Sequence, residues 1–210
     1  MTLDINGLEH AIVRHCSPAL AGIKPSCLFN VPGDFASPTC HGRRMRLDAL
    51  VDRENELLAS HGVRIRVLAR RACGALVLVY RPELLGMQLR ESQVSRLLHG
   101  WGYATRGRGW LEAALDRLGN QLQERSCSPD GAFPHEVGLF LGYPVDDVIG
   151  FIEHEGRDYL CCGCWKVYSH PERAQACFAS YRRCTQACLE LLENGSTVAD
   201  LASGHMGIAA

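Results

Sequence analysis

The segment CCGC places three thiols within four residues, at Cys161, Cys162 and Cys164. Cysteine thiolates bind metal ions such as Zn²⁺, and a structural zinc site usually has tetrahedral geometry with protein side chains as ligands. A strand directs Cys162 and Cys164 to one face and Cys161 to the other. All three thiols therefore reach one ion only if Gly163 forms a bulge.

Further thiol ligands could come from the long helix that is predicted after this segment. Its cysteines recur at spacings that place them on one helical face: Cys177, Cys184 and Cys188. If this face packs on the strand, a thiol cluster forms at the contact, and the cluster suits a metal ion or redox chemistry. The alternative is that the face is the core side of the helix, where cysteine packs as a small apolar side chain.

A second candidate site is formed by His15 and Cys16, which directly precede Ser17 and Pro18. Serine is favoured as a helix N-cap and proline at the first helical position, so a helix is predicted to begin here. A thiol beside a helix N-terminus has a lowered pKa, which favours a nucleophilic Cys16 with His15 as its base. In the alternative, Cys16 packs at a helix junction and His15 is exposed.

A third candidate site lies in FPHEVGLFLGYPVDDVIGFI, residues 133–152, where His135 and Glu136 precede a predicted strand. Strand alternation directs the two side chains to opposite faces. Glu136 then shares a face with Gly138 and Gly142, and His135 lies on the apolar side as a structural group. We therefore expect Glu136 to be the catalytic candidate of this pair.

Gly138 and Gly142 leave one face of the predicted strand without side chains. Such a bare face allows a ligand or another backbone to approach closely. One interpretation is a shallow pocket with aromatic walls from three residues: Tyr143, Trp165 and Tyr168. The alternative is close packing of a helix over the two glycines.

Charge and hydropathy exclude several function classes. Lys and Arg number 22 and Asp and Glu number 23, giving a net charge of −1, so nothing favours nucleic acid or an anionic membrane as partner. No segment reaches the roughly 18 apolar residues of a membrane span, and the N-terminus lacks a signal-peptide pattern. We therefore expect a cytoplasmic protein, in which the 11 cysteines are reduced.

The elements that must position these residues follow from hydrophobic periodicity and from Gly and Pro. Helices are predicted over 2–14, from Pro18 onward, and over 45–60, 82–98, 110–124, 145–155 and 171–193, and strands over 63–67, 75–80, 137–142 and 158–168. The first two strands form a hairpin and the last two a β-α-β unit. The expected fold is α+β, with a mixed sheet of about four strands covered by several helices. Residues 1–202 are expected to form a single domain, and 203–210 a frayed tail.

Three motifs together resemble the bacterial family of domain of unknown function 3793: HCSPALAGIK, FPHEVGLFLGYPVDDVIGFI, and WKVY before a capped helix. The resemblance covers nearly the whole chain. It implies a single cytosolic domain from mostly anaerobic bacteria, and it draws attention to His15–Cys16, His135–Glu136 and Trp165–Tyr168. It assigns no reaction and no cofactor.

Three hypotheses for the function remain open. The first is a cytosolic accessory protein that handles thiols, a metal ion or a redox cofactor. The second is a small-molecule enzyme with its pocket near Glu136, His135 and Trp165. The third is a non-catalytic domain that binds a partner. Whether the chain is an enzyme stays open, and a small molecule, a metal ion or a redox protein are the partners considered.

Overall fold

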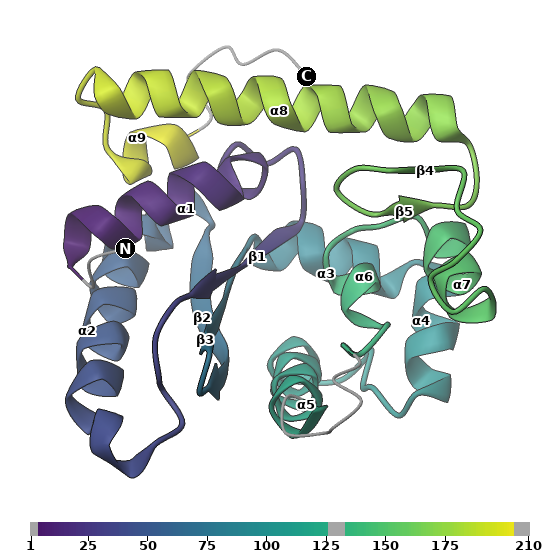
Figure 1. Ribbon diagram of the computed structural model, residues 1–210, viewed down its shortest axis with the longest axis horizontal. Helices are drawn as coiled ribbons and strands as arrows, with labels where there is room; N and C mark the ends of the chain where they lie inside the picture. The colour runs from purple at the N-terminus through teal and green to yellow at the C-terminus, as the bar shows by residue number, and fades with distance from the viewer. Residues whose placement is uncertain (1–3, 126–132, 204–210) are drawn as a thin grey trace.

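The computed structural model describes residues 4–125 and 133–203 (Figure 1). Within these ranges the α-helices are α1 (Ile5–Leu20), α2 (His41–Leu58), α3 (Pro82–Arg90), α4 (Ser92–Gly100), α5 (Trp110–Arg125), α6 (Val137–Phe140), α7 (Val145–Glu153), α8 (Pro171–Glu193) and α9 (Val198–Ala202). The strands are β1 (Ser26–Val31), β2 (Arg64–Arg71), β3 (Gly74–Tyr80), β4 (Cys161–Cys162) and β5 (Lys166–Val167). Short 3-10 turns are η1 (Pro38–Cys40) and η2 (Ala59–His61).

The main sheet is antiparallel, in the order β1-β3-β2. The central strand β3 is buried along its whole length, as its uninterrupted apolar sequence predicts for an interior strand. Alternation sends Val77 and Val79 into one hydrophobic cluster and Leu76 and Leu78 into another. The sheet thus separates two cores. The hairpin that joins β2 to β3 confirms the sequence prediction.

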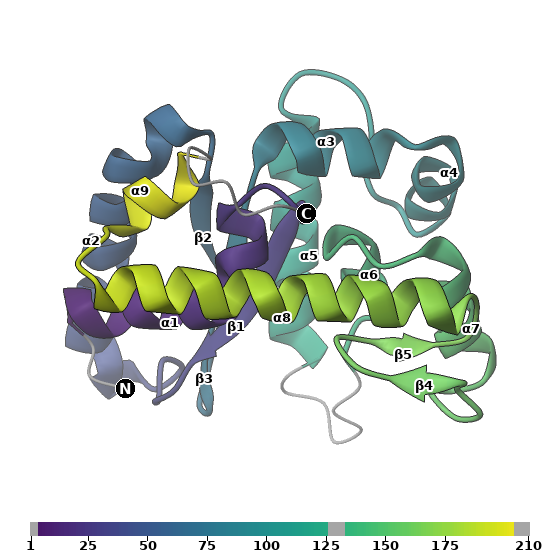
Figure 2. The ribbon, with the colours of Figure 1, turned by 90° about the horizontal axis from the view of Figure 1, so that it is seen from above.

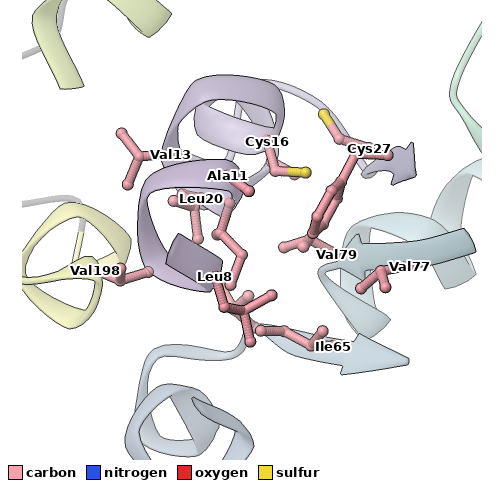
Figure 3. Packing of buried hydrophobic residues seen from close by; sticks show 14 of the residues in the cluster. Leu8, Ala11, Val13, Cys16, Leu20, Cys27, Ile65, Val77, Val79 and Val198 are labelled. Atoms are coloured by element: carbon pink, nitrogen blue, oxygen red, sulfur yellow. The ribbon is translucent and has the colours of Figure 1, made fainter. Parts of the chain in front are cut away.

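Helices cover both faces of this sheet. Figure 1 shows α1, α2 and α9 on one side and α3 to α7 on the other, with α8 running across the top of both groups. The first core lies between α1, α2, the C-terminal half of α8, α9 and the sheet, and includes Leu8, Cys16 and Val79 (Figure 3). The second core packs α3 to α7 against the opposite face. None of the helices in the described ranges is long and apolar enough to span a membrane.

A separate two-stranded sheet, β4-β5, packs under the N-terminal half of α8 (Figure 2). Trp165, Val167 and Phe178 form its small core. Gly163 lies in the turn, where an added Cβ would approach the Phe178 ring to 2.3 Å. Only glycine fits there, because any side chain would force the hairpin away from α8.

The α+β class is confirmed, but the sheet arrangement differs from the prediction. The main sheet is wholly antiparallel and the expected β-α-β unit is absent, because residues 137–140 form helix α6 instead of a strand. Strand β1 lies in a region for which the sequence predicted no strand, after the helix expected from Pro18 onward. Both errors concern short apolar runs, whose conformation periodicity alone does not decide.

Helix boundaries also differ from the prediction at two places. Helix α1 is continuous to Leu20, with Pro18 in its last turn, where a break and a new helix were expected. The helix predicted over 82–98 divides into α3 and α4 at Glu91, whose ψ of 139° is not helical. Single-domain organisation over 1–202 stays a prediction, and the tail predicted over 203–210 lies, apart from Ser203, outside the described residues.

Arg81, between β3 and α3, joins the carboxyl ends of three helical segments. It precedes Pro82, which favours its extended backbone (φ −103°, ψ 109°). Its guanidinium donates to Ala19 O (2.9 Å) and Leu20 O at the end of α1. It also donates to His61 O (2.9 Å) at the end of η2 and to Ala202 O (2.8 Å) at the end of α9. Carbonyls at helix ends lack intrahelical partners and carry partial negative charge, so one cation satisfies all three ends.

We predict that Arg81→Met lowers the free energy of unfolding by about 3 kcal/mol, because partly buried carbonyls lose charge-assisted hydrogen bonds. Chemical denaturation measures the change. Arg64→Met, at an exposed position of β2, is the control and should lower the free energy of unfolding by less than about 0.5 kcal/mol. Equal stability of the two variants would show that Arg81 does not hold the three ends together.

Glu54, on α2, is a buried carboxyl that faces the first core. It is 1% exposed, and neither carboxylate oxygen has a hydrogen-bond partner among the described residues. Burial, with repulsion from Glu9 as a smaller cause, raises the pKa of Glu54 from 4.5 to about 7. The folded state therefore retains a proton that the unfolded chain releases at lower pH.

This difference makes the free energy of unfolding depend on pH. Below pH 4.5 both states are protonated and Glu54 has no effect, and between 4.5 and about 7 stability falls as pH rises. We predict that Glu54→Gln, which cannot ionise, gains stability relative to the wild type over this interval. Thermal unfolding at pH 4.5 and pH 8 measures the difference. Glu56→Gln, at an exposed position on the same helix, should follow the wild type at both values.

Candidate functional site

A cavity of about 430 Å³ lies between α6, α7 and β5. Four residues singled out from the sequence line it: His135, Gly138, Tyr143 and Trp165. The remaining lining is mainly apolar: Phe133, Pro134, Val137, Val148, Phe151 and Ile152, with Asp147, Glu155 and Lys166 as polar members. The sequence prediction of a pocket with aromatic walls thus has a matching cavity, although its function stays a prediction.

The tight turn after α6 builds one wall of the cavity. Gly142 has a φ of +72°, which ends the helix, and Tyr143 N donates back to Gly138 O (2.9 Å). This bond returns the Tyr143 ring over Gly138. A Cβ at Gly138 would lie 2.9 Å from Val148 and 3.1 Å from Tyr143. Gly138 is therefore required by close helix packing, the alternative considered for this glycine, and it lines the cavity as well.

His135 and Glu136 diverge, but in the opposite sense to the prediction. His135 lines the cavity with Gly138, and its ring lies 5.3 Å from that of Phe151. Glu136 is absent from the cavity lining; it accepts a hydrogen bond from Tyr103 Oη (3.1 Å) and lines another hollow, which His135 also borders. The physical reason is the helical turn, in which residues three apart share a face, whereas a strand would have paired Glu136 with Gly138.

Stacked aromatic rings form the wall between the cavity and α8. The rings of Tyr143 and Trp165 stack at 4.9 Å, and Trp165 meets Phe178 edge-on at 4.5 Å. The Tyr143 hydroxyl donates to Cys164 O (3.1 Å). Burial raises the pKa of Tyr143, so the phenol stays neutral and keeps this donor.

Asp147, in the first turn of α7, fixes this wall. Its side chain is 2% exposed and accepts from Trp165 Nε1 (2.7 Å), Tyr168 N (2.8 Å), Ser169 N (2.8 Å) and Ser169 Oγ (3.1 Å). The sequence Ser-His-Pro-Glu at 169–172 is typical of a capping box, in which Ser169 would cap α8 with Glu172. Ser169 instead bonds Asp147, and His170, with φ 46°, is the N-cap of α8.

Tyr168 and Gly142, two other predicted pocket residues, lie elsewhere. The Tyr168 ring stacks on His154 at 5.5 Å, and its Cβ packs against Gly150. Its hydroxyl is buried without a partner among the described residues. Gly142 lines a second hollow beside α8, where an added Cβ would lie 2.7 Å from Pro25. Gly138 and Gly142 therefore do not share one pocket floor.

His15 and Cys16 do not precede a helix, because both lie inside α1. Cys16 is fully buried, and burial, together with the neighbouring Cys27 thiol, raises its pKa (Figure 3). The helix-terminus argument for a nucleophilic Cys16 therefore does not hold. His15 stacks on Phe29 at 5.9 Å, and burial lowers its pKa.

The cysteines predicted to share a metal ion are divided between two places. Cys161, Cys162 and Cys164 lie on the β4-β5 hairpin, where Cys161 and Cys177 pack at the same small core. Cys184 and Cys188 lie in the first core against α1. The part of the chain that the structure describes holds no group of three or more His, Cys, Asp or Glu placed to bind a metal ion. Residues seven or more apart on the 23-residue α8 are too distant along its axis to join one site.

We predict that Asp147→Asn destabilises the protein by about 2 kcal/mol. The reason is that the NH2 group of asparagine is itself a donor and would face N–H and O–H groups that now donate to the carboxylate. The fluorescence of Trp165 should shift as its indole loses its partner. Asp146→Asn, at the exposed neighbouring position, is the matched control and should change neither property. A silent Asp147→Asn would mean that packing alone holds Trp165.

Comparison with known proteins places the chain in one family. A family model described as "Protein of unknown function (DUF3793)" matches residues 12–202. Searches of curated proteins and of solved structures found no match. The matched region includes all three motifs that carry the sequence resemblance, together with α6, α7, β5 and the cavity between them. Because the match covers more than half of the chain, the protein belongs to the DUF3793 family.

Proposed function

We propose that the protein binds a small molecule in the cavity between α6, α7 and β5. The observation that carries this proposal is the cavity itself, about 430 Å³ in volume, with apolar and aromatic walls and few polar groups. Small-molecule sites usually have these properties, because apolar walls supply affinity and a few polar groups fix orientation. The expected ligand is mainly apolar, contains a flat ring, and has one polar end.

The aromatic wall supports a ring-containing ligand. Tyr143 and Trp165 are held by hydrogen bonds to Cys164 O and Asp147, so neither ring must be ordered when the ligand binds. A wall that is already ordered lowers the entropic cost of binding. Offset stacking on such rings adds affinity beyond burial of area.

The polar groups of the cavity favour one polar end on the ligand. Lys166 Nζ donates to Gly156 O (2.7 Å) and lies 5.6 Å from the Phe151 ring centre. This ammonium therefore already interacts with groups of the protein. His135 and Glu155 contribute the other titratable side chains besides buried Asp147. A hydroxyl, amide or amine on the ligand fits His135 and Glu155 better than a strong anion does.

Binding is better supported than catalysis by this arrangement. A reaction that moves a proton needs an acid–base group at the substrate, usually positioned by a partner. His135 lines the cavity, but Glu136, the expected catalytic candidate of this pair, bonds Tyr103 instead. The thiol and metal hypothesis loses its proposed ligand set, since the cysteines are divided. A cytoplasmic location and an origin in anaerobic bacteria stay predictions.

We predict that Nile red, a neutral aromatic dye, binds with one site per chain and gains fluorescence in the cavity. Val137→Trp places an indole in this space and should abolish the gain, because the cavity is filled. Leu160→Trp adds the same group at a position that is 61% exposed and outside the cavity, and should bind the dye as the wild type does. Fluorescence titration measures both.

Thermal unfolding of the two variants checks that each is folded. The proposal fails if the folded wild type binds no dye, or if Val137→Trp and Leu160→Trp bind it equally. In the second case the dye lies on another apolar surface.

A further inference from the structure

A further hollow, distinct from the one that Gly142 lines, has a volume of about 400 Å³ and lies between the end of α1, the start of β1 and the middle of α8. It is separate from the proposed ligand cavity and shares none of its lining residues. Lys24 and Arg182 contribute two positive charges to it, and Cys27 and Cys164 contribute two thiols. Its lining includes no aspartate or glutamate.

Lys24 is the unusual residue of this hollow, because it is only 8% exposed. Its ammonium lies 5.2 Å from the ring centre of Tyr143 and 5.6 Å from that of Tyr181. None of the ion pairs within the described residues includes Lys24, and its ammonium has no hydrogen-bond partner there. Most of the lysine is buried, but its Nζ reaches the hollow, so an anion that enters the hollow can pair with it.

The backbone holds Lys24 in this position. After α1 ends, Ile23 N and Lys24 N both donate to Pro18 O, each at 3.0 Å. Gly22, with φ +74°, supplies the turn that allows these bonds. The lysine is therefore directed between the two tyrosine rings by a fixed turn.

Of the other groups near the hollow, the Cys27 thiol offsets part of its positive charge at neutral pH, and His15 and Glu190 do not change that charge. Burial and Arg14 lower the pKa of His15, so this ring is uncharged there. The nearest described acid on α8, Glu190, accepts a hydrogen bond from Gln186 Nε2 (2.7 Å) and is not part of the lining. The hydrogen bond with Cys16 is the main cause that lowers the pKa of Cys27 to about 7, so its thiolate offsets part of the Lys24 charge at neutral pH, while Arg182 keeps the hollow cationic.

We propose that this hollow is a binding site for a small oxyanion, a carboxylate or a phosphate group, with Lys24 as its buried counter-ion and Arg182 at its mouth. Among the described residues the ammonium contacts two aromatic rings but has no hydrogen-bond or ion-pair partner, and the lining has no carboxylate. A guanidinium on the exposed side is suited to two-point contact with either group. Thr185 lines the same hollow and adds a hydroxyl.

The thiol of Cys164, an exposed residue at this hollow, provides a direct test. Iodoacetate and iodoacetamide alkylate thiols alike but differ in charge, so their rate ratio at Cys164 reports attraction of an anion. Residue-resolved mass spectrometry measures the ratio. We expect Lys24→Met and Arg182→Gln each to lower it by about fivefold, as for a partly exposed charge pair. The ratio at Cys162, on the same hairpin but outside the hollow, should not change.

Arg183→Gln is the matched control, because it removes the same charge at the neighbouring exposed residue of α8, which does not line the hollow. The proposal is overturned if Arg183→Gln lowers the ratio at Cys164 as much as Arg182→Gln does, or if neither Lys24→Met nor Arg182→Gln lowers it. Should Lys24→Met fail to fold, Arg182→Gln on the surface decides alone.

Competition separates the two kinds of oxyanion. Inorganic phosphate and acetate are each added during iodoacetate labelling, with sodium chloride at equal ionic strength as reference. Greater protection of Cys164 by phosphate identifies a phosphate site, and greater protection by acetate identifies a carboxylate site. Protection no greater than that by chloride overturns the proposal, since it reflects screening alone.

Discussion

The fold depends on one cation that three helical ends share. The guanidinium of Arg81 bonds carbonyls at the ends of α1, η2 and α9, which lie far apart in the sequence. Arg81 also follows the central strand, and its N–H donates to Pro25 O (3.0 Å) just before β1. The helical layer is thus fixed relative to the sheet at one point. Without a cation there, the carbonyls of Leu20, His61 and Ala202 would lose this donor, at a cost that packing would have to offset.

Asp147 is an anion, and its role in the other half of the molecule is similar to that of the Arg81 cation. Its carboxylate accepts from Trp165, which directly precedes β5, and from the turn before α8, so the hairpin, α7 and α8 meet at one anion. The proposed ligand cavity lies directly beside it. Trp165 therefore has a dual position, because its indole N–H is bonded to Asp147 while its ring lines the cavity and stacks on Tyr143. A buried charge that is fully bonded can hold a wall in one conformation.

Tyr143 separates the two proposed sites. Tyr143 lines the apolar cavity, and the ammonium of Lys24 lies 5.2 Å from the centre of its ring. The two spaces differ in chemistry: one is apolar with His135 and Glu155, the other is cationic with two thiols.

The sequence by itself determined the class, the central hairpin and the family, and it singled out four residues that line the cavity: His135, Gly138, Tyr143 and Trp165. These features depend on local patterns: alternation on β2, the continuous apolar run of β3, and a long motif around residues 133–152. Tertiary structure alone decided that α6 is a helix, and therefore which of His135 and Glu136 lines the cavity, because a short apolar run fits either conformation until its neighbours bury it. It also decided the positions of Cys16, Arg81 and Asp147, whose partners lie on other elements. Pairings between residues far apart in the chain leave no local pattern, so their geometry appears only when the chain is packed.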